Sequence, residues 1–186
     1  MRLFVAVWPP DEILQVIDDL DRPVVAGVRW TAPAQWHVTL RFLGEVPAGQ
    51  AGTVARALAA GAQAVQGPVQ ATMGPVTAWF PGRRVLQVPV AGLDELAGVV
   101  GGVTATFGRH REERRFAGHL TLARVGGRVQ GPPWLAGRAV AGTWPVRAVH
   151  LVASDRRPDG ARYRSLAVVR LGGGWDPTPN RCSKLQ

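Results

Sequence analysis

The hydrophobic residues of this chain follow two spacings, one typical of strands and one typical of helices. Residues 2–8 are mostly apolar at successive positions, which is the pattern of a strand buried on both faces, and residues 84–90 form a second such run. Apolar residues at helical spacing follow each run, first at Ile13, Val16, Ile17 and Leu20 and then at Leu93, Leu96, Ala97 and Val100. The two halves of the chain therefore begin alike, with a strand and then a helix.

The other elements are predicted from the same spacings and from prolines and glycines. An alanine-rich helix is expected from Pro47 to about Val65, and Gly108 is expected to stop the helix of the second half. Short or bent strands are expected at 28–31, 69–73 and 76–79, a charged loop at 109–115, and two longer strands at about 140–153 and 162–171. The glycine, proline and polar residues of 172–186 predict a poorly ordered tail.

One short motif occurs twice, as His37-Val38-Thr39-Leu40 and as His119-Leu120-Thr121-Leu122, at an offset of 82 (119 − 37). Arg2 and Arg84, which precede the two apolar runs, differ by the same offset (84 − 2). A constant offset indicates a duplicated strand–helix–strand unit. We therefore expect an α+β fold: one bilobal domain over 1–171 with pseudo-two-fold symmetry. Two mostly antiparallel sheets would face a central cleft, with the helices outside.

The repeated histidines and threonines suggest acid–base chemistry. Side chains two apart on a strand share a face, so each His lies beside its own Thr. A histidine exchanges protons near neutral pH, and two of them across a cleft suit a reaction that needs a base and an acid. Neither motif has the spacing of a metal site, and we find no phosphate-binding glycine loop or nucleophile elbow. A metal-free acid–base reaction on a phosphate ester is the remaining prediction.

A single His-x-Thr strand is common and is usually structural, so the prediction depends on the duplication. A duplicated scaffold could also keep these residues for packing, although a buried histidine would then need partners that a threonine only partly supplies. The other two histidines, His110 and His150, lie outside the motif. We expect both to be structural or at the surface.

Composition adds a charge signal. Hydrophobic residues make up 46% and charged residues 19% of the 186, as in an ordinary globular protein, but the formal net charge is +9. Lys184 is the only lysine, so nearly all cations are arginines, which bind phosphate oxygens in pairs of hydrogen bonds. An RNA partner and a merely solvated basic surface are both consistent with this charge. Cys182 is the only cysteine, and no stretch could span a membrane, so a cytoplasmic protein is expected.

The sequence resembles the 2H phosphoesterase superfamily, and within it the LigT-like RNA 2′,3′-cyclic phosphodiesterases, also called 2′-5′ RNA ligases. The resemblance covers nearly all of residues 1–171. It rests on Met1–Val7, Trp36–Val46, Phe80-Pro81 with Arg84-Val85-Leu86, Phe116 with His119–Arg124, and Gly160–Tyr163. Ala117-Gly118 precedes the second motif where the family commonly has a proline.

The resemblance implies metal-independent hydrolysis of an RNA-terminal 2′,3′-cyclic phosphate to a 2′-phosphate, without a cofactor. His119 would be the proton acceptor acting on water, His37 the proton donor to the 3′ oxygen, and Thr39 and Thr121 would hold phosphate oxygens. Run in reverse, the same chemistry would join a cyclic phosphate end to a 5′-hydroxyl without ATP. The near-symmetry of the two motifs leaves the roles of acid and base exchangeable.

The resemblance also implies that Arg124 binds phosphate and that Phe42 stacks on a base. Strand alternation would turn both away from the histidines, unless a bulge or an early strand end at Leu40 and Leu122 intervenes. For Phe42 a core position is the alternative. Tyr163 is expected either to approach the cleft from the last strand pair or to pack in the core. Trp30 and Trp36, near the first motif, are further candidates for stacking.

Three alternative functions stay open from the sequence. The chain could be a non-catalytic nucleotide- or RNA-binding module, it could act on 2′-5′ oligonucleotides or another cyclic phosphate, or, least in keeping with the motifs, it could be a metal-dependent hydrolase. The expected partners are RNA ends or nucleotides that carry a 2′,3′-cyclic phosphate, and we expect a monomer that does not bind membranes.

Overall fold

The computed structural model describes residues 1–108, 115–127, 129–157, 160–172 and 175–176. Within them the α-helices are α1 (Asp11–Asp18), α2 (Ala51–Gln63) and α3 (Asp94–Val103), and short 3-10 helices are η1 (Pro33–Gln35), η2 (Ala48–Gln50) and η3 (Pro133–Leu135). The strands are β1 (Arg2–Val7), β2 (Val28–Trp30), β3 (Val38–Glu45), β4 (Val69–Met73), β5 (Ala78–Trp79), β6 (Val85–Ala91), β7 (His119–Val125), β8 (Gly142–Val146), β9 (Ala148–Arg157), β10 (Gly160–Arg170) and β11 (Trp175–Asp176).

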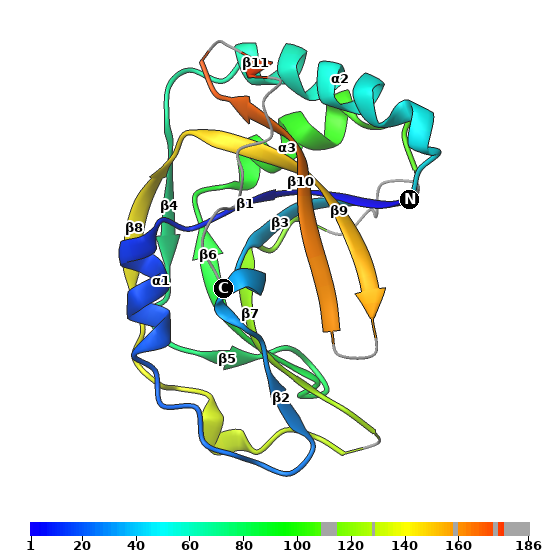
Figure 1. Ribbon diagram of the computed structural model, residues 1–186. Helices are drawn as coiled ribbons and strands as arrows, with labels where there is room; N and C mark the ends of the chain where they lie inside the picture. Colours follow the sequence, from blue (N-terminus) through cyan, green and yellow to red (C-terminus); the bar gives the residue numbers. More distant parts are fainter. Residues whose placement is uncertain (109–114, 128, 158–159, 173–174, 177–186) are drawn as a thin grey trace.

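The strands form one strongly curled sheet, with the order β11-β10-β9-β1-β3-β7-β6-β4-β8; β2 also pairs with β7 and β5 with β6 (Figure 1). The pairing is antiparallel, as predicted, but the prediction of two separate sheets is wrong. The halves are joined because Val38 of β3 pairs with Leu120 of β7. In the described part of the chain this is the one register pair between β3 and β7. One group of strands (β1, β3, β9, β10 and β11) lies on one side of this pair and the other group (β2 and β4–β8) on the other, while the sheet stays continuous.

The duplication is visible in the strand pairing, but its offset is not constant. Thr39 pairs with Ala6 of β1, and Thr121 pairs with Gln87 of β6. The two threonines differ by 82 positions (121 − 39), whereas their partners differ by 81 (87 − 6). The expected equivalence of Arg2 with Arg84 is therefore wrong by one position. The strand pairs β1–β3 and β6–β7 define which residues are equivalent, and the starts of the two apolar runs do not.

The helices interlock the two halves. Helix α1 follows β1 in the chain but packs near β8, where its Ile13 would clash with any Cβ at Gly142, 2.6 Å away. Helix α3 follows β6 but packs on β3, where the buried Arg41 donates hydrogen bonds to Gly101 O (2.7 Å) and Thr104 Oγ1 (2.8 Å). Helix α2 lies beside α3 on the same side of the sheet (Figure 1). One core cluster therefore contains residues of both halves.

Two predicted elements end elsewhere. The strand expected at 140–153 is two strands, β8 and β9, because the segments before and after Arg147 pair with β4 and β1, on opposite parts of the sheet. Helix α3 ends at Val103 rather than running to Phe107, although Gly108 has the left-handed conformation (φ 65°) expected of a stop.

Other predictions fall partly outside the described residues. Most of the charged loop at 109–115, with His110, and most of the tail at 172–186, with Cys182, lie there. Within the tail, Trp175–Asp176 pair with β10 as β11.

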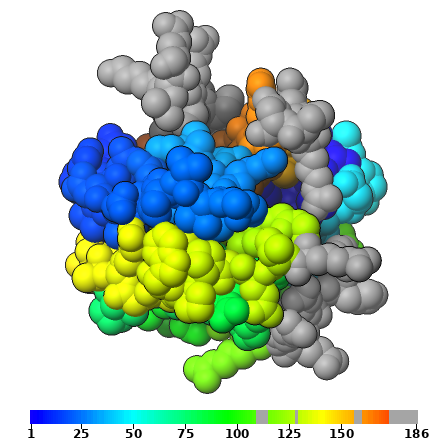
Figure 2. Space-filling model, turned by 90° about the horizontal axis from the view of Figure 1, so that it is seen from below, coloured from blue at the N-terminus to red at the C-terminus, as the bar shows by residue number. Residues whose placement is uncertain are grey.

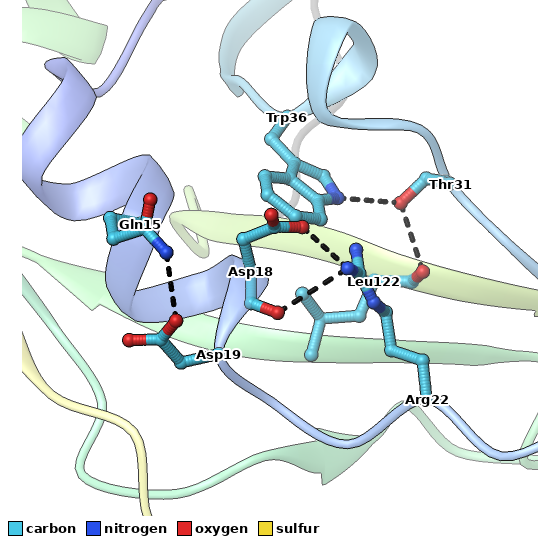
Figure 3. A network of polar contacts seen from close by, with 7 residues as sticks. All are labelled: Gln15, Asp18, Asp19, Arg22, Thr31, Trp36 and Leu122. Atoms are coloured by element: carbon cyan, nitrogen blue, oxygen red, sulfur yellow. Dashed lines mark hydrogen bonds and ion pairs between the residues drawn. The ribbon is translucent and has the colours of Figure 1, made fainter.

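A series of hydrogen bonds from Trp36 through Thr31, called the relay, connects the residues before His37 to β7 (Figure 3). Trp36, which is 1% exposed, donates from Nε1 to Thr31 Oγ1 at 3.0 Å. The Thr31 hydroxyl in turn lies 2.8 Å from Thr121 O and 2.9 Å from Leu122 O, and the Thr31 amide also donates to Leu122 O. The two repeated motifs are therefore connected by side chains as well as by the backbone pair.

A second contact between the halves lies on the face seen in Figure 2. There residues 10–35 (blue) lie against residues 130–145 (yellow), and the Arg138 side chain donates a hydrogen bond to Asp21 O at 2.6 Å. The segment that leads from α1 to the first motif is thus held against the second half at more than one place.

Thr31→Val tests the relay. The substitution keeps the shape of the side chain but removes the hydroxyl, which leaves the buried Trp36 Nε1 without its acceptor. We expect the free energy of unfolding, measured in urea, to fall by about 1–3 kcal/mol. Thr53→Val is the matched control, since Thr53 is exposed on α2 and its hydroxyl contacts Arg56 at the surface. Equal stability of the two variants would show that the relay does not stabilise the fold.

Candidate active site

The two His-Thr pairs lie on one face of the curled sheet. Val38, Leu40, Leu120 and Leu122 are buried in the core, so the alternating residues His37, Thr39, His119 and Thr121 occupy the opposite face. Because Val38 pairs with Leu120, the antiparallel register sets His37 across from Thr121 and Thr39 across from His119. The four predicted residues are therefore brought together around the junction of the two halves, and the surface that they form is called the His-Thr face.

Both imidazoles are oriented by the same local hydrogen bond. His37 Nδ1 lies 2.7 Å from Gln35 O, and His119 Nδ1 lies 2.8 Å from Ala117 O. A carbonyl oxygen only accepts, so Nδ1 of each ring carries the hydrogen and Nε2 keeps a lone pair. The duplication thus extends to the tautomer, and each histidine can use Nε2 as a base, or as an acid once it is protonated.

The two rings differ in their surroundings. His37 stacks with Trp8 (centroids 5.3 Å apart) and also contacts Phe4 (5.0 Å) and Tyr163 (5.0 Å, edge-on). His119 contacts Phe80 edge-on at 4.7 Å. The halves are therefore alike in backbone and hydrogen bonding but unlike in the packing of the imidazole.

Both histidines have lowered pKa values. The pKa of His37 is lowered to about 4, mainly by burial; the hydrogen bond to the Gln35 carbonyl raises it, and the charges of His119 and Arg124 lower it. Burial, with a smaller contribution from Arg124, also lowers the pKa of His119. At neutral pH both rings are therefore uncharged in the free protein. The pKa of His37 responds to His119 and Arg124, and the pKa of His119 responds to Arg124, so the three side chains lie within electrostatic reach of one another.

A bulge in each strand brings Phe42 and Arg124 to the His-Thr face. The register with the partner strand shifts at Leu40 in β3 and at Leu122 in β7. These two leucines hold the same place in the two motifs, and so do Phe42 and Arg124, three positions after each Thr. The prediction that a bulge would reconcile strand alternation with these residues is confirmed. Phe42 is 58% exposed, so the alternative of a core position for it is wrong.

Tyr163 of β10 also reaches the His-Thr face. Its ring contacts His37 and packs edge-on against Phe4 at 5.2 Å. Burial raises the pKa of its hydroxyl, although the charges of Arg124 and Arg2 act in the opposite direction. Tyr163 was expected either to approach the cleft or to pack in the core, and in the structure it lies near His37. Its role in binding stays a prediction.

Three further side chains on this face were not predicted from the sequence. Trp8 and Phe80 contact the two imidazoles, as described above, and His150 is paired with Ala6 and contacts Trp8 at 5.2 Å. Trp8 follows directly on an apolar run, so nothing in the sequence separates it from the core. His150 was expected to be structural or at the surface; it is half-buried, with Nδ1 3.3 Å from Ser165 Oγ, and burial lowers its pKa.

The two tryptophans proposed for stacking do not provide an exposed platform. Trp36 is buried in the core, and Trp30 is half-buried, with Nε1 donating to Pro23 O at 3.0 Å. Among the described residues, no three His, Cys, Asp or Glu side chains gather as a metal site requires. In the same part of the chain, no helix has the length and apolar character needed to cross a membrane.

The chain is similar in sequence to known proteins. The model of a family described as LigT like Phosphoesterase matches residues 7–72. An RNA 2′,3′-cyclic phosphodiesterase of Thermus thermophilus is 31% identical over 187 aligned positions, which cover 93% of this chain and 91% of that protein. The chain belongs to the LigT-like 2H phosphoesterase family. The resemblance inferred from the sequence is thereby confirmed.

Several solved structures share this fold. TT0787 of Thermus thermophilus is similar with a TM-score of 0.75 at 27% identity, covering 93% of this chain and 99% of that one. LigT of Escherichia coli, solved with 3′-AMP, gives a TM-score of 0.70 at 26% identity, with 92% and 98% covered. The similarity extends over nearly the whole chain, so both halves of the curled sheet belong to the common fold.

The lowered histidine pKa values predict that stability depends on pH. An unfolded histidine titrates near 6.5, so between pH 6.5 and about 4 the unfolded chain binds protons that folded His37 does not. The free energy of unfolding should therefore fall on acidification through this window, by about 1–3 kcal/mol for His37. Urea unfolding at several pH values would measure it. His37→Gln should give a shallower slope, and identical slopes for variant and wild type would contradict the assignment.

Proposed function

We propose that this protein hydrolyses the 2′,3′-cyclic phosphate at an RNA end to a 2′-phosphate, by metal-independent acid–base catalysis. One observation carries the proposal: two histidine–threonine pairs face one another across the junction of β3 and β7, each with Nε2 available. The relative of Thermus thermophilus named RNA 2′,3′-cyclic phosphodiesterase and the 3′-AMP complex of Escherichia coli LigT support a nucleotide substrate.

In the proposed reaction, His119 Nε2 takes a proton from water while the water oxygen forms a bond to phosphorus. The bond from phosphorus to the 3′ oxygen breaks, and that oxygen receives a proton from His37. Thr39 and Thr121, each beside a histidine, would donate hydrogen bonds to the non-bridging oxygens, and Arg124 would offset their charge. The reverse reaction, with a 5′-hydroxyl in place of water, is ATP-independent 2′-5′ ligation.

The protonation states constrain both histidines without deciding between them. Both imidazoles are uncharged in the free protein, so the acid must gain a proton when the anionic substrate binds and raises the pKa of the rings that face it. Burial among Phe4, Trp8 and Tyr163 makes a protonated His37 a strong acid but also makes that protonated form scarce at neutral pH. The assignment of His37 as donor and His119 as acceptor therefore follows the family resemblance.

Histidine substitutions test the reaction. His37→Ala and His119→Ala should each lower kcat for 2′,3′-cyclic AMP by about 10²–10⁴-fold, because either end of the reacting bond then lacks its proton carrier. Gln70→Ala, at an exposed position of β4, is the control. Full activity in either motif variant would reject the two-histidine mechanism. A wild-type protein that binds 3′-AMP without turning over cyclic phosphate would instead favour a binding module.

Charge at the edge of the His-Thr face supports an RNA substrate over a mononucleotide. Arg29 of β2 pairs in register with Arg124 of β7, so two exposed guanidinium groups share one face. Like charges directly opposite one another destabilise a sheet. In the described part of the chain neither arginine forms an ion pair with an acidic residue. Phosphates further along an RNA strand would relieve this repulsion.

Arg29→Gln tests the RNA partner. It should lower kcat/KM for an oligoribonucleotide ending in a cyclic phosphate by about threefold to tenfold at low salt, because one phosphate contact is lost. The value for 2′,3′-cyclic AMP should change little, since glutamine brings no charge beside Arg124. Arg56→Gln, on the exposed surface of α2, is the charge-matched control. Equal losses on both substrates, or none on the oligoribonucleotide, would reject Arg29 as an RNA contact.

A further inference from the structure

Gln87 is a buried polar residue on the His-Thr face. It lies in β6, paired with Thr121 on one side and with Ala78 on the other. Cross-strand partners share a face, so its side chain lies on the same face as Thr121 and His119. Its neighbours Leu86 and Val88 are buried in the core on the other face. Gln87 therefore lies on the floor of the candidate site, next to the second His-Thr pair.

The side-chain oxygen of Gln87 lacks a partner. Gln87 is 7% exposed, and among the described residues its Oε1 accepts no hydrogen bond although it is out of contact with solvent. An unsatisfied buried polar atom destabilises the folded state, and buried amides in folded proteins are almost always paired. A methionine or leucine of similar volume would fill the same space without this cost. The stability of the fold therefore does not explain why position 87 carries an amide.

The duplication supplies a comparison for Gln87. The equivalent position in the first half is Ala6, which pairs with Thr39 as Gln87 pairs with Thr121. The backbone at this place therefore tolerates a methyl group beside the threonine. The amide is present in only one of the two halves, the half that holds His119, so it makes the two His-Thr pairs chemically different.

We propose that the Gln87 amide positions the oxygen that attacks phosphorus. The inference rests on the proposed function, in which His119 Nε2 takes one proton of the water. In the free protein Gln87 Oε1 is enclosed, and a half-turn of the amide about its last bond brings this oxygen to the water. The second O–H of the water then donates to Oε1, and one lone pair of the water oxygen points at phosphorus. Water is a donor, which matches the unpaired acceptor. In ligation the 5′-hydroxyl oxygen would occupy the same place, with its single proton passing to His119.

Gln87→Met, which keeps the length of the side chain and removes the amide, tests the proposal. We expect kcat for 2′,3′-cyclic AMP to fall by about 10–100-fold, since a misplaced nucleophile loses about this factor, while KM stays within about threefold. The melting temperature should stay equal or rise, because an unpaired buried polar group is removed. Gln70→Met, at an exposed position of β4, is the control and should leave kcat unchanged.

A second variant separates the acceptor from the shape. Gln87→Glu keeps an acceptor oxygen and should retain more of kcat than Gln87→Met, but its charge should raise KM for the anionic substrate. A kcat of Gln87→Met near that of wild type would overturn the proposal, and so would a lowered melting temperature, which would make the amide structural. An inactive wild type would reject the proposed function together with this inference, whereas an active wild type with an equally active Gln87→Met rejects Gln87 alone.

Discussion

The backbone pair between Val38 and Leu120 is the contact on which the site depends. It joins two groups of strands that otherwise have their own partners, and it lies one position after each motif histidine. The Thr31 hydroxyl reinforces the junction by linking Trp36 to the carbonyl groups of β7. Because the two histidines come from opposite sides of this junction, their separation is set by main-chain geometry rather than by flexible side chains. A reaction that uses one histidine as acid and the other as base would need the two rings held at a fixed separation.

The same face shows how a duplicated scaffold acquires unequal chemistry. Backbone register, the bulges at Leu40 and Leu122, and the hydrogen bond from each Nδ1 are common to both halves. The differences are side chains placed on this shared frame: aromatic rings around His37, and an amide beside Thr121. Symmetric geometry brings two similar groups to one face, and asymmetric packing then gives the two imidazoles different surroundings.

Much of the fold and of the site could be predicted from the chain itself. The motif around His37 and its copy around His119 are local signals, and so are the helical spacing after each apolar run and the left-handed Gly108. The histidine tautomer is also local, since each ring bonds a carbonyl two positions earlier. Each of these features depends on residues that are close together in the sequence, which is why the sequence alone can indicate it.

Other features depended on contacts between residues distant in sequence. The single curled sheet, the division of 140–153 into two strands, and the change of repeat offset between motif and partner strand all follow from which strands pair, and sequence spacing does not encode partner choice. For the same reason Trp8 and Gln87 looked like ordinary strand residues. The sequence by itself determined the chemical groups, two histidines and two threonines repeated at one spacing. Only the tertiary structure decided that they share a face, because that arrangement depends on one backbone pair formed between distant parts of the chain.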